Sequence, residues 1–172
     1  STSKVTFAGA GIAALSSSPA NIADIKSKVQ WSTIGPDKIN QLRHVRFFGD
    51  ADGLREHMKK HADIIRPKFE EVIESLDKEL SELEIAQWSH PTGGYFVSFD
   101  AMEGCAKKIV AKCKEAGLVL TGAGAAFPYG KDPKDSNIRI APTMPPMEEL
   151  KEAMQLFVTC VKLVTVEKLL EA

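Results

Sequence analysis

The chain has 172 residues, of which 44% are hydrophobic and 26% are charged, and its formal net charge is −1. These values are typical of a folded globular domain, and they argue against a strongly basic, nucleic-acid-binding protein. No apolar run reaches membrane-spanning length and no signal peptide is visible, so we expect neither nucleic acid nor a membrane as a partner.

The first notable pattern is Ser1-Thr2-Ser3-Lys4, which is followed by Gly9-Ala10-Gly11. A lysine amine forms a Schiff base with an aldehyde only when it is neutral, which requires burial or a neighbouring cation. Serine hydroxyls and the backbone N–H groups of a glycine loop are suitable donors to a phosphate. Most lysines beside serines are solvated surface residues, however, so the pattern alone indicates only a candidate site.

Residues 1–50 show no clean periodicity. Pro19 is expected to start a short helix that continues through Val29, and Pro36-Asp37 a second one through Leu42. We expect this region to consist of short helices and loops that pack against something else.

Apolar residues then recur at steps of three and four over residues 52–83, which predicts one long amphipathic helix. Pro67 lies within it and is expected to kink or restart it. A helix of this length commonly connects two domains.

The pattern of the remaining residues predicts alternating strands and helices. We expect the chain as a whole to have an α+β fold. The expected strands are 95–99, 118–121 and 137–141, the expected helices are 103–116 and 147–171, and a long loop covers 122–136. Cys105, Cys113 and Cys160 are odd in number and scattered. They fit reduced, buried thiols of a cytoplasmic protein, and neither a disulfide framework nor a zinc site.

Arg139 is the next candidate, because it lies between Ile138 and Ile140 on a predicted strand. Its neighbours point to the opposite face, so the guanidinium need not be buried with them. Arginine binds carboxylates through two parallel hydrogen bonds. A solvated edge residue or a structural ion pair would give the same pattern, and so both alternatives stay open. Likewise, the paired Gly93-Gly94 before Tyr95 permits a close backbone approach to a ligand, or forms a plain turn.

Together these pieces resemble the fold-type-I aminotransferases of class I/II, which depend on pyridoxal 5'-phosphate. The resemblance is strongest to the bacterial aspartate-aminotransferase-like group, and it covers essentially the whole chain. It is carried by the serine-flanked lysine, Pro-Thr-Gly-Gly-Tyr-Phe at 91–96, Thr-Gly-Ala-Gly-Ala-Ala-Phe-Pro-Tyr-Gly at 121–130 and Ser-Asn-Ile-Arg-Ile-Ala-Pro at 136–142. Each motif is weak alone, but their order and spacing are specific.

The resemblance implies a role for each matching residue. Lys4 corresponds to the lysine that holds the cofactor and shuttles a proton during transamination, and Ser1, with Ser3 beside it, to a hydroxyl that binds the cofactor phosphate. Arg139 corresponds to the arginine that binds the substrate α-carboxylate, and Gly94 to backbone at the substrate entrance. The implied substrates are an amino acid, with aspartate as the best analogy, and a 2-oxo acid. The implied assembly is a homodimer.

The resemblance also implies that the chain is the C-terminal part of such an enzyme. Residues 1–50 would end the large cofactor-binding domain, and 51–172 would form the small C-terminal domain with the long interdomain helix. In the family, the group that pairs with the cofactor ring nitrogen and most phosphate donors precede the lysine, so the chain alone is expected to be inactive. Many relatives have an arginine eight residues after the lysine, whereas this chain has Ile12, which leaves the phosphate contacts uncertain.

Two alternatives remain at this point. His57 and His61 are four residues apart on the long helix, as in some metal sites, but two histidines without a third ligand are more typical of a solvated helix face. The chain as a whole could instead be a stand-alone α+β binding or interaction module in which Lys4 is incidental.

Overall fold

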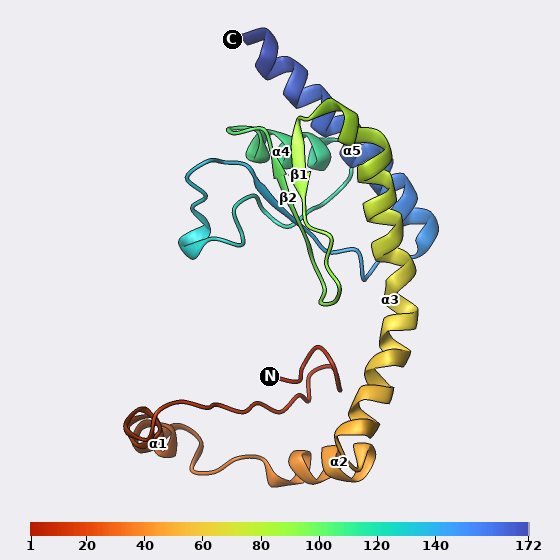
Figure 1. Ribbon diagram of the computed structural model, residues 1–172. Helices are drawn as coiled ribbons and strands as arrows, with labels where there is room; N and C mark the ends of the chain where they lie inside the picture. Colours follow the sequence, from red (N-terminus) through yellow and green to blue (C-terminus); the bar gives the residue numbers. More distant parts are fainter. Residues whose placement is uncertain (172) are drawn as a thin grey trace. The chain divides into compact units, whose positions relative to one another are not determined.

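The computed structural model describes residues 1–171, which form an α+β fold (Figure 1). They make two compact units, Ser1–Ile64 and a second one that begins at Ile65. The first contains helices α1 (Pro19–Thr33) and α2 (Lys38–Phe48). Helix α3 (Ala51–Leu80) begins in the first unit and ends in the second, which also contains a three-stranded sheet, α4 (Ala106–Glu115) and α5 (Met147–Glu171). The predicted fold class is confirmed.

The two short helices begin where the sequence predicts, because each has a side-chain cap. The hydroxyl of Ser18 accepts a hydrogen bond from the backbone N–H of Asn21 at 3.3 Å, and Pro19 occupies the first turn of α1. The Asp37 carboxylate caps α2 by accepting from the backbone N–H of Asn40 at 3.0 Å. Both helices extend several residues beyond their predicted ends. No residue of α1 is buried, so this helix supplies no side chain to a core within the described chain.

The long helix is present as predicted, with two differences. It ends at Leu80 and is followed by a 3₁₀ turn, Ser81–Leu83, so the last predicted turn is tighter than an α-helix. Of the kink or restart predicted at Pro67, the restart is wrong, because α3 continues through this residue. Proline removes only one backbone donor, and the apolar stripe that includes the buried Val72 and Leu76 continues past it.

The sheet consists of β1 (Ala86–Trp88), β2 (Val97–Ala101) and β3 (Asn137–Ile140), antiparallel and in that order. β2 and β3 correspond to two of the predicted strands. β1 was not predicted, because three residues are too few to show the alternation of a strand. Phe99 lies opposite Ile138 and Ser98 lies opposite Arg139, so one face of the sheet is apolar and the other polar.

The predicted strand at 118–121 is wrong. The backbone N–H of Leu118 binds the carbonyl of Cys113 at 2.7 Å, at the end of α4, and residues 119–121 pair with no strand of the described chain. The residue types favour an extended chain, but a strand also requires a neighbour for its hydrogen bonds.

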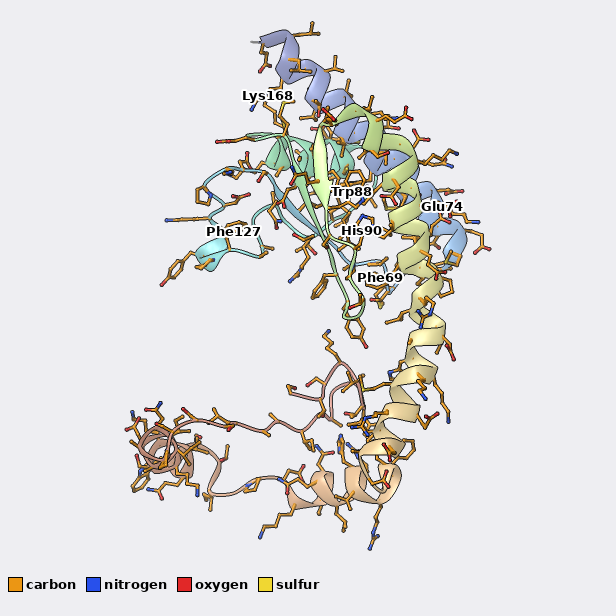
Figure 2. The ribbon with its side chains drawn as sticks, in the orientation of Figure 1. Phe69, Glu74, Trp88, His90, Phe127 and Lys168 are labelled. Carbon is orange, nitrogen blue, oxygen red and sulfur yellow. The ribbon has the colours of Figure 1, made fainter. Side chains whose placement is uncertain are left out.

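The hydrophobic core of the second unit lies between the apolar face of the sheet and helices α3, α4 and α5. Phe99 and Phe157 meet edge to face with ring centroids 5.0 Å apart, and Trp88 stacks on Phe99 at 6.2 Å. The indole Nε1–H of Trp88 donates to a carboxylate oxygen of Asp77 at 2.8 Å, which joins the edge of the sheet to α3 (Figure 2). Lys168 of α5 donates to the carbonyl of Glu103.

The three cysteines are buried free thiols. Burial raises the pKa of Cys105, and it raises the pKa of Cys113 to about 12, with the neighbouring Cys160 adding to the shift.

In the part of the chain that the structure describes, no helix is both long and apolar enough to cross a membrane.

Candidate functional site

The candidate lysine lies in a turn that is closed at its base by Thr2 and Ile12. The backbone N–H of Thr2 donates to the carbonyl of Ile12 at 2.7 Å, and the backbone N–H of Ile12 donates to the Thr2 hydroxyl at 2.8 Å. The backbone N–H of Thr6 also donates to the carbonyl of Thr2 at 3.0 Å. Lys4 is exposed within this turn. The amine is therefore presented by a short loop with fixed ends.

The two serines lie beside each other at the start of this loop. Their hydroxyl oxygens are 2.7 Å apart, and the backbone N–H of Ser3 donates to the Ser1 hydroxyl at 3.3 Å. Gly11 crosses close to them, and a Cβ at this position would lie 2.6 Å from the Ser3 hydroxyl and 2.7 Å from its backbone N and Cα. Only glycine allows this close approach. Ser1 and Ser3 therefore lie side by side at the start of the loop that carries Lys4.

Thr6 and His44, which the sequence analysis missed, hold the lysine loop against α2. The Thr6 hydroxyl lies 3.0 Å from His44 Nε2, and His44 Nδ1 lies 2.8 Å from the carbonyl of Asn40. Both residues are buried. Because a carbonyl only accepts, Nδ1 donates to it, and the Thr6 hydroxyl lies within hydrogen-bond distance of both His44 Nε2 and the Thr2 carbonyl, at 3.0 and 3.1 Å. Nothing in the sequence around Thr6 indicates that its side chain binds a histidine 38 positions later.

An aromatic cluster next to this contact accounts for His57. Phe7 meets the rings of His44, Phe47 and Phe48 with centroids 5.0 to 5.8 Å apart, and the ring of His57 lies 5.2 Å from that of Phe48. His57 and His61 are adjacent, with ring centroids 4.4 Å apart. Within residues 1–171, no three histidine, cysteine, aspartate or glutamate side chains are grouped as metal ligands. His57 packs as an aromatic ring.

Arg139 occupies the polar face of the sheet, in the middle of β3. Its guanidinium carbon lies 4.3 Å from the ring centroid of Phe96, which precedes β2, and its Nε is buried without a hydrogen-bond partner. No carboxylate of the described chain lies within ion-pair distance of it. A structural ion pair, one of the two alternatives that the sequence left open, is therefore excluded within residues 1–171. A cation held on an aromatic ring with an unpaired donor is suited to bind a carboxylate from elsewhere.

The strand that carries Arg139 is anchored on both sides of its first residue. The side-chain amide of Asn137 donates to the Ser98 hydroxyl at 3.0 Å and to the Asp100 carboxylate at 2.8 Å. The Asp132 carboxylate accepts the backbone N–H groups of Asn137 and Ser136, each at 2.8 Å, and that of Lys134 at 3.0 Å. These bonds, that of Asn137 first, hold the pKa of Asp132 below its usual range. The loop before β3 is thus fixed by a carboxylate.

Gly94 lies in the loop between β1 and β2, two residues before the aromatic ring that contacts Arg139. Its φ of +95° is in the left-handed region, where other residues are strained, and a Cβ there would meet no atom within 4 Å. The glycine is therefore required for the conformation of the turn. The candidate residues of the second unit, Gly94 and Arg139, lie on one hairpin loop and the strand beyond it, and the contribution of Phe96 was not predicted.

Comparisons with known proteins give one consistent result. A family model described as aspartate amino-transferase matches residues 1–172. An aminotransferase of Mycolicibacterium smegmatis is 53% identical over 170 residues, which are 99% of this chain and 40% of that protein. Crystal structures of an aminotransferase from Corynebacterium diphtheriae and of an aspartate transaminase from Corynebacterium glutamicum superpose with TM-scores of 0.90 and 0.92, at 51% and 47% identity. They are matched over 96% and 98% of this chain and 41% and 40% of theirs. The chain spans about 40% of the length of these relatives.

Proposed function

Because this chain belongs to the aspartate aminotransferase family, we propose that it supplies the cofactor lysine and the substrate arginine of a pyridoxal-phosphate-dependent aminotransferase. The whole protein would transfer an amino group between an amino acid, aspartate or a similar one, and a 2-oxo acid. The cofactor, when bound, supplies an aldehyde for amine exchange and a ring that withdraws electrons from the substrate α-carbon.

Lys4 binds the cofactor through its Nζ and afterwards moves the proton. With the cofactor bound, the amine of Lys4 would move the proton between the substrate α-carbon and the cofactor. The closed turn between Thr2 and Ile12 limits where this amine can reach. This support comes from the loop geometry and from the position of Lys4 in the family motif.

The hydroxyls of Ser1 and Ser3 are suitable hydrogen-bond donors to the phosphate of the cofactor. Ser1 and Ser3 lie side by side and exposed, and Lys4 follows them directly, so one short loop carries an amine and two hydroxyl donors. Ile12 cannot provide the ion pair that many relatives form at this position, and its backbone N–H is already bound to Thr2. The donor set therefore fits an aldehyde with a phosphate, with further phosphate donors from residues outside this chain.

Arg139 binds the α-carboxylate of the substrate, and its surroundings are the main support for the proposal. The guanidinium rests on Phe96, and its buried Nε lacks a partner, although a buried donor without a partner is costly. A substrate carboxylate would satisfy that donor and neutralise the charge. Gly94 would line the entrance to the same place, since it lies two residues before Phe96.

The proposal extends to the whole protein. Residues 1–50 would end its large cofactor-binding domain, and 51–172 would form its small C-terminal domain with α3 as the interdomain helix. The assembled enzyme would be a homodimer, and the 172-residue chain would be inactive by itself, because the ring-binding groups lie in the rest of the protein. The position of Arg139 in the family motif, together with its buried Nε that has no partner within residues 1–171, favours this proposal over a stand-alone binding module.

The test uses the full-length protein and pyridoxal phosphate. We expect a visible absorbance band from the bound cofactor, and borohydride reduction should attach the cofactor covalently to the peptide that contains Lys4. Lys4→Ala should abolish the band and transamination, whereas the control Lys38→Ala, an exposed lysine at the start of α2, should leave both unchanged. A band that persists in Lys4→Ala would refute the assignment, and the binding module would then be preferred.

A further inference from the structure

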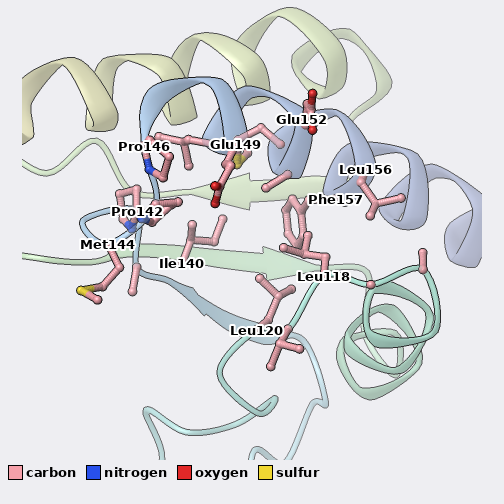
Figure 3. A pocket seen from close by; sticks show the side chains of 18 residues that line it. Leu118, Leu120, Ile140, Pro142, Met144, Pro146, Glu149, Glu152, Leu156 and Phe157 are labelled. Carbon is pink, nitrogen blue, oxygen red and sulfur yellow. The ribbon is translucent and has the colours of Figure 1, made fainter.

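Helix α2 buries one residue in the described chain, and that residue is polar. His44 is 4% exposed, whereas three apolar residues of the same helix are 48–84% exposed, namely Ile39, Leu42 and Val45. Helices usually bury apolar side chains, as α5 does with Phe157, which lines the pocket shown in Figure 3. The burial of a histidine in α2 therefore indicates a use for its two ring nitrogens.

Both ring nitrogens of His44 have a partner. Nδ1 donates to the carbonyl of Asn40 at 2.8 Å, and Nε2 lies 3.0 Å from the Thr6 hydroxyl. At neutral pH an imidazole is mostly uncharged and has a proton on one nitrogen only. With that proton on Nδ1, Nε2 accepts, and the Thr6 hydroxyl donates to it. His44 thus connects α2 to the loop that carries Lys4.

From Thr6, hydrogen bonds continue to the base of this loop. The backbone N–H of Thr6 donates to the Thr2 carbonyl at 3.0 Å, and Thr2 and Ile12 are joined by two bonds of 2.7 and 2.8 Å. Lys4 lies midway in sequence between Thr2 and Thr6. A continuous path of hydrogen bonds therefore runs from His44 to both ends of the loop that presents the amine.

Helix α2 holds the loop at a second point, one turn before His44. The side-chain amide of Asn40 donates to the carbonyl of Ala10 at 2.9 Å. Between the two points, the ring of Phe7 meets that of His44 with centroids 5.0 Å apart. The loop is thus bound to one helix on both sides of its aromatic residue, and the side chains of Asn40 and His44 make these contacts.

We propose that His44 is a positioning residue for Lys4, which acts through the Thr6 hydroxyl on the turn that carries the amine. Lys4 has to reach one place to bind the cofactor and to move the proton, and a turn that is tied to α2 restricts its reach. The role of Lys4 rests on the proposed function. The path of hydrogen bonds exists without the cofactor, so it is tested separately.

Amide hydrogen exchange in the full-length protein without cofactor tests the path. His44→Phe keeps a ring against Phe7 but removes both nitrogens, and the Thr6 hydroxyl can then turn to the Thr2 carbonyl 3.1 Å away. We expect the Ile12 amide to exchange about 2- to 10-fold faster, since one neutral hydrogen bond is lost. His44→Gln places an amide oxygen near the position of Nε2 and should restore the rate. Unchanged exchange in His44→Phe would overturn the proposal, because ring packing would then be sufficient.

The protonation of the ring can be observed directly. Histidine-selective 15N NMR of the same protein at pH 8 should show the His44 proton on Nδ1, as its bond to the Asn40 carbonyl requires. A neutral ring with its proton on Nε2 would contradict the proposed path.

Cofactor binding and kinetics test the effect on Lys4. Thr6→Val removes the hydroxyl at nearly constant volume, and should weaken the binding of pyridoxal phosphate by about 2- to 10-fold, measured by the absorbance band. It should lower kcat by a similar factor and leave KM for the amino acid unchanged. Thr6→Ser keeps a hydroxyl and should restore both values. The control His90→Gln, at an exposed histidine of the second unit, should match the wild type.

Two results would overturn the positioning role. One is faster exchange of the Ile12 amide in His44→Phe with cofactor binding and kcat unchanged, because the path would then not act on Lys4. The other is a raised KM in Thr6→Val with constant kcat and cofactor affinity. The cofactor band in Lys4→Ala separately decides the proposed function.

Discussion

The two compact units hold their candidate residues by different means. All of the buried hydrophobic residues of the described chain belong to the second unit, and they lie under the sheet that carries Arg139. In the first unit, only Thr6 and His44 are buried, and large apolar side chains such as Trp31 and Ile34 are 86% and 96% exposed. A residue of the second unit is therefore positioned by a core, whereas Lys4 is positioned by a loop with a few hydrogen bonds. The exposed apolar side chains of the first unit form a surface of the kind that binds another segment or molecule.

The largest expected effect tests whether stability resides in the second unit. Phe99→Ala removes a fully buried ring between Trp88 and Phe157, and should lower the free energy of unfolding by about 3–5 kcal/mol. Trp31→Ala, at an exposed position of α1, should change it by less than about 0.5 kcal/mol. Urea denaturation of the 172-residue chain measures both. Similar losses from the two substitutions would mean that the first unit also has a core.

The next effect concerns the side chain that the core positions. Arg139→Ala in the full-length protein should raise the KM for the amino acid by about 30-fold or more, because a buried charge pair with the substrate is worth about 2–5 kcal/mol. Arg139→Lys should not restore it, since a lysine lacks the planar fork. The cofactor band should persist in both. The control Arg66→Ala, at an exposed position of α3, should leave KM unchanged, and an unchanged KM in Arg139→Ala would remove Arg139 from the site.

A smaller effect is expected from the ring that supports Arg139. Phe96→Leu removes the aromatic face 4.3 Å from the guanidinium, which is worth about 0.5–2 kcal/mol. KM for the amino acid should therefore rise by about 2- to 30-fold, while kcat stays nearly constant. Phe96→Tyr keeps an aromatic ring and should restore most of the affinity. Steady-state kinetics measures this, and a fall in kcat with constant KM would contradict a positioning role.

The loop of the first unit is tested by Gly11→Ala. The added methyl would lie within 2.7 Å of the Ser3 backbone, so the loop must open. We expect weaker binding of pyridoxal phosphate by the full-length protein, measured by titration of the absorbance band, with thermal unfolding of the second unit unchanged. Gly35→Ala is the control, because a Cβ there meets no atom. Normal cofactor binding by Gly11→Ala would show that the close approach of Gly11 and Ser3 is unnecessary.

The smallest effect is a pH dependence confined to the core of the second unit. The Cys113 thiol has its pKa raised from 9.0 to about 12, chiefly by burial, so the folded state keeps its proton where the unfolded chain loses it. The contribution of Cys113 to stability should therefore be constant below pH 9 and decline as the pH rises from 9 toward 12. Cys113→Ala should flatten this decline in urea denaturation curves. An equally steep decline in the variant would assign it to other groups.

Local sequence signals predicted the parts of the molecule that depend on neighbouring residues. Helix α5 occupies the predicted range, and α1 and α2 begin where they were predicted to start, because start signals and periodicity act over a few residues. The prediction of a strand at 118–121 was wrong for the opposite reason. These residues favour an extended chain, but a strand also requires a hydrogen-bond partner from another part of the fold. The serine-flanked Lys4 and the strand of Arg139 were likewise visible as motifs, and the family comparison confirmed the resemblance that they suggested.

By itself, the sequence determined the order of the main helices, the α+β class, the family and the candidate site residues. Only the tertiary structure decided that Arg139 Nε has no partner within residues 1–171, that its guanidinium lies on Phe96, that Thr6 binds His44, and that Gly11 contacts Ser3. These contacts join residues that are separated by up to 43 positions, in the case of Phe96 and Arg139. Periodicity and propensity describe neighbours along the chain, whereas such contacts depend on strand register and loop closure, which are fixed only when the whole unit packs.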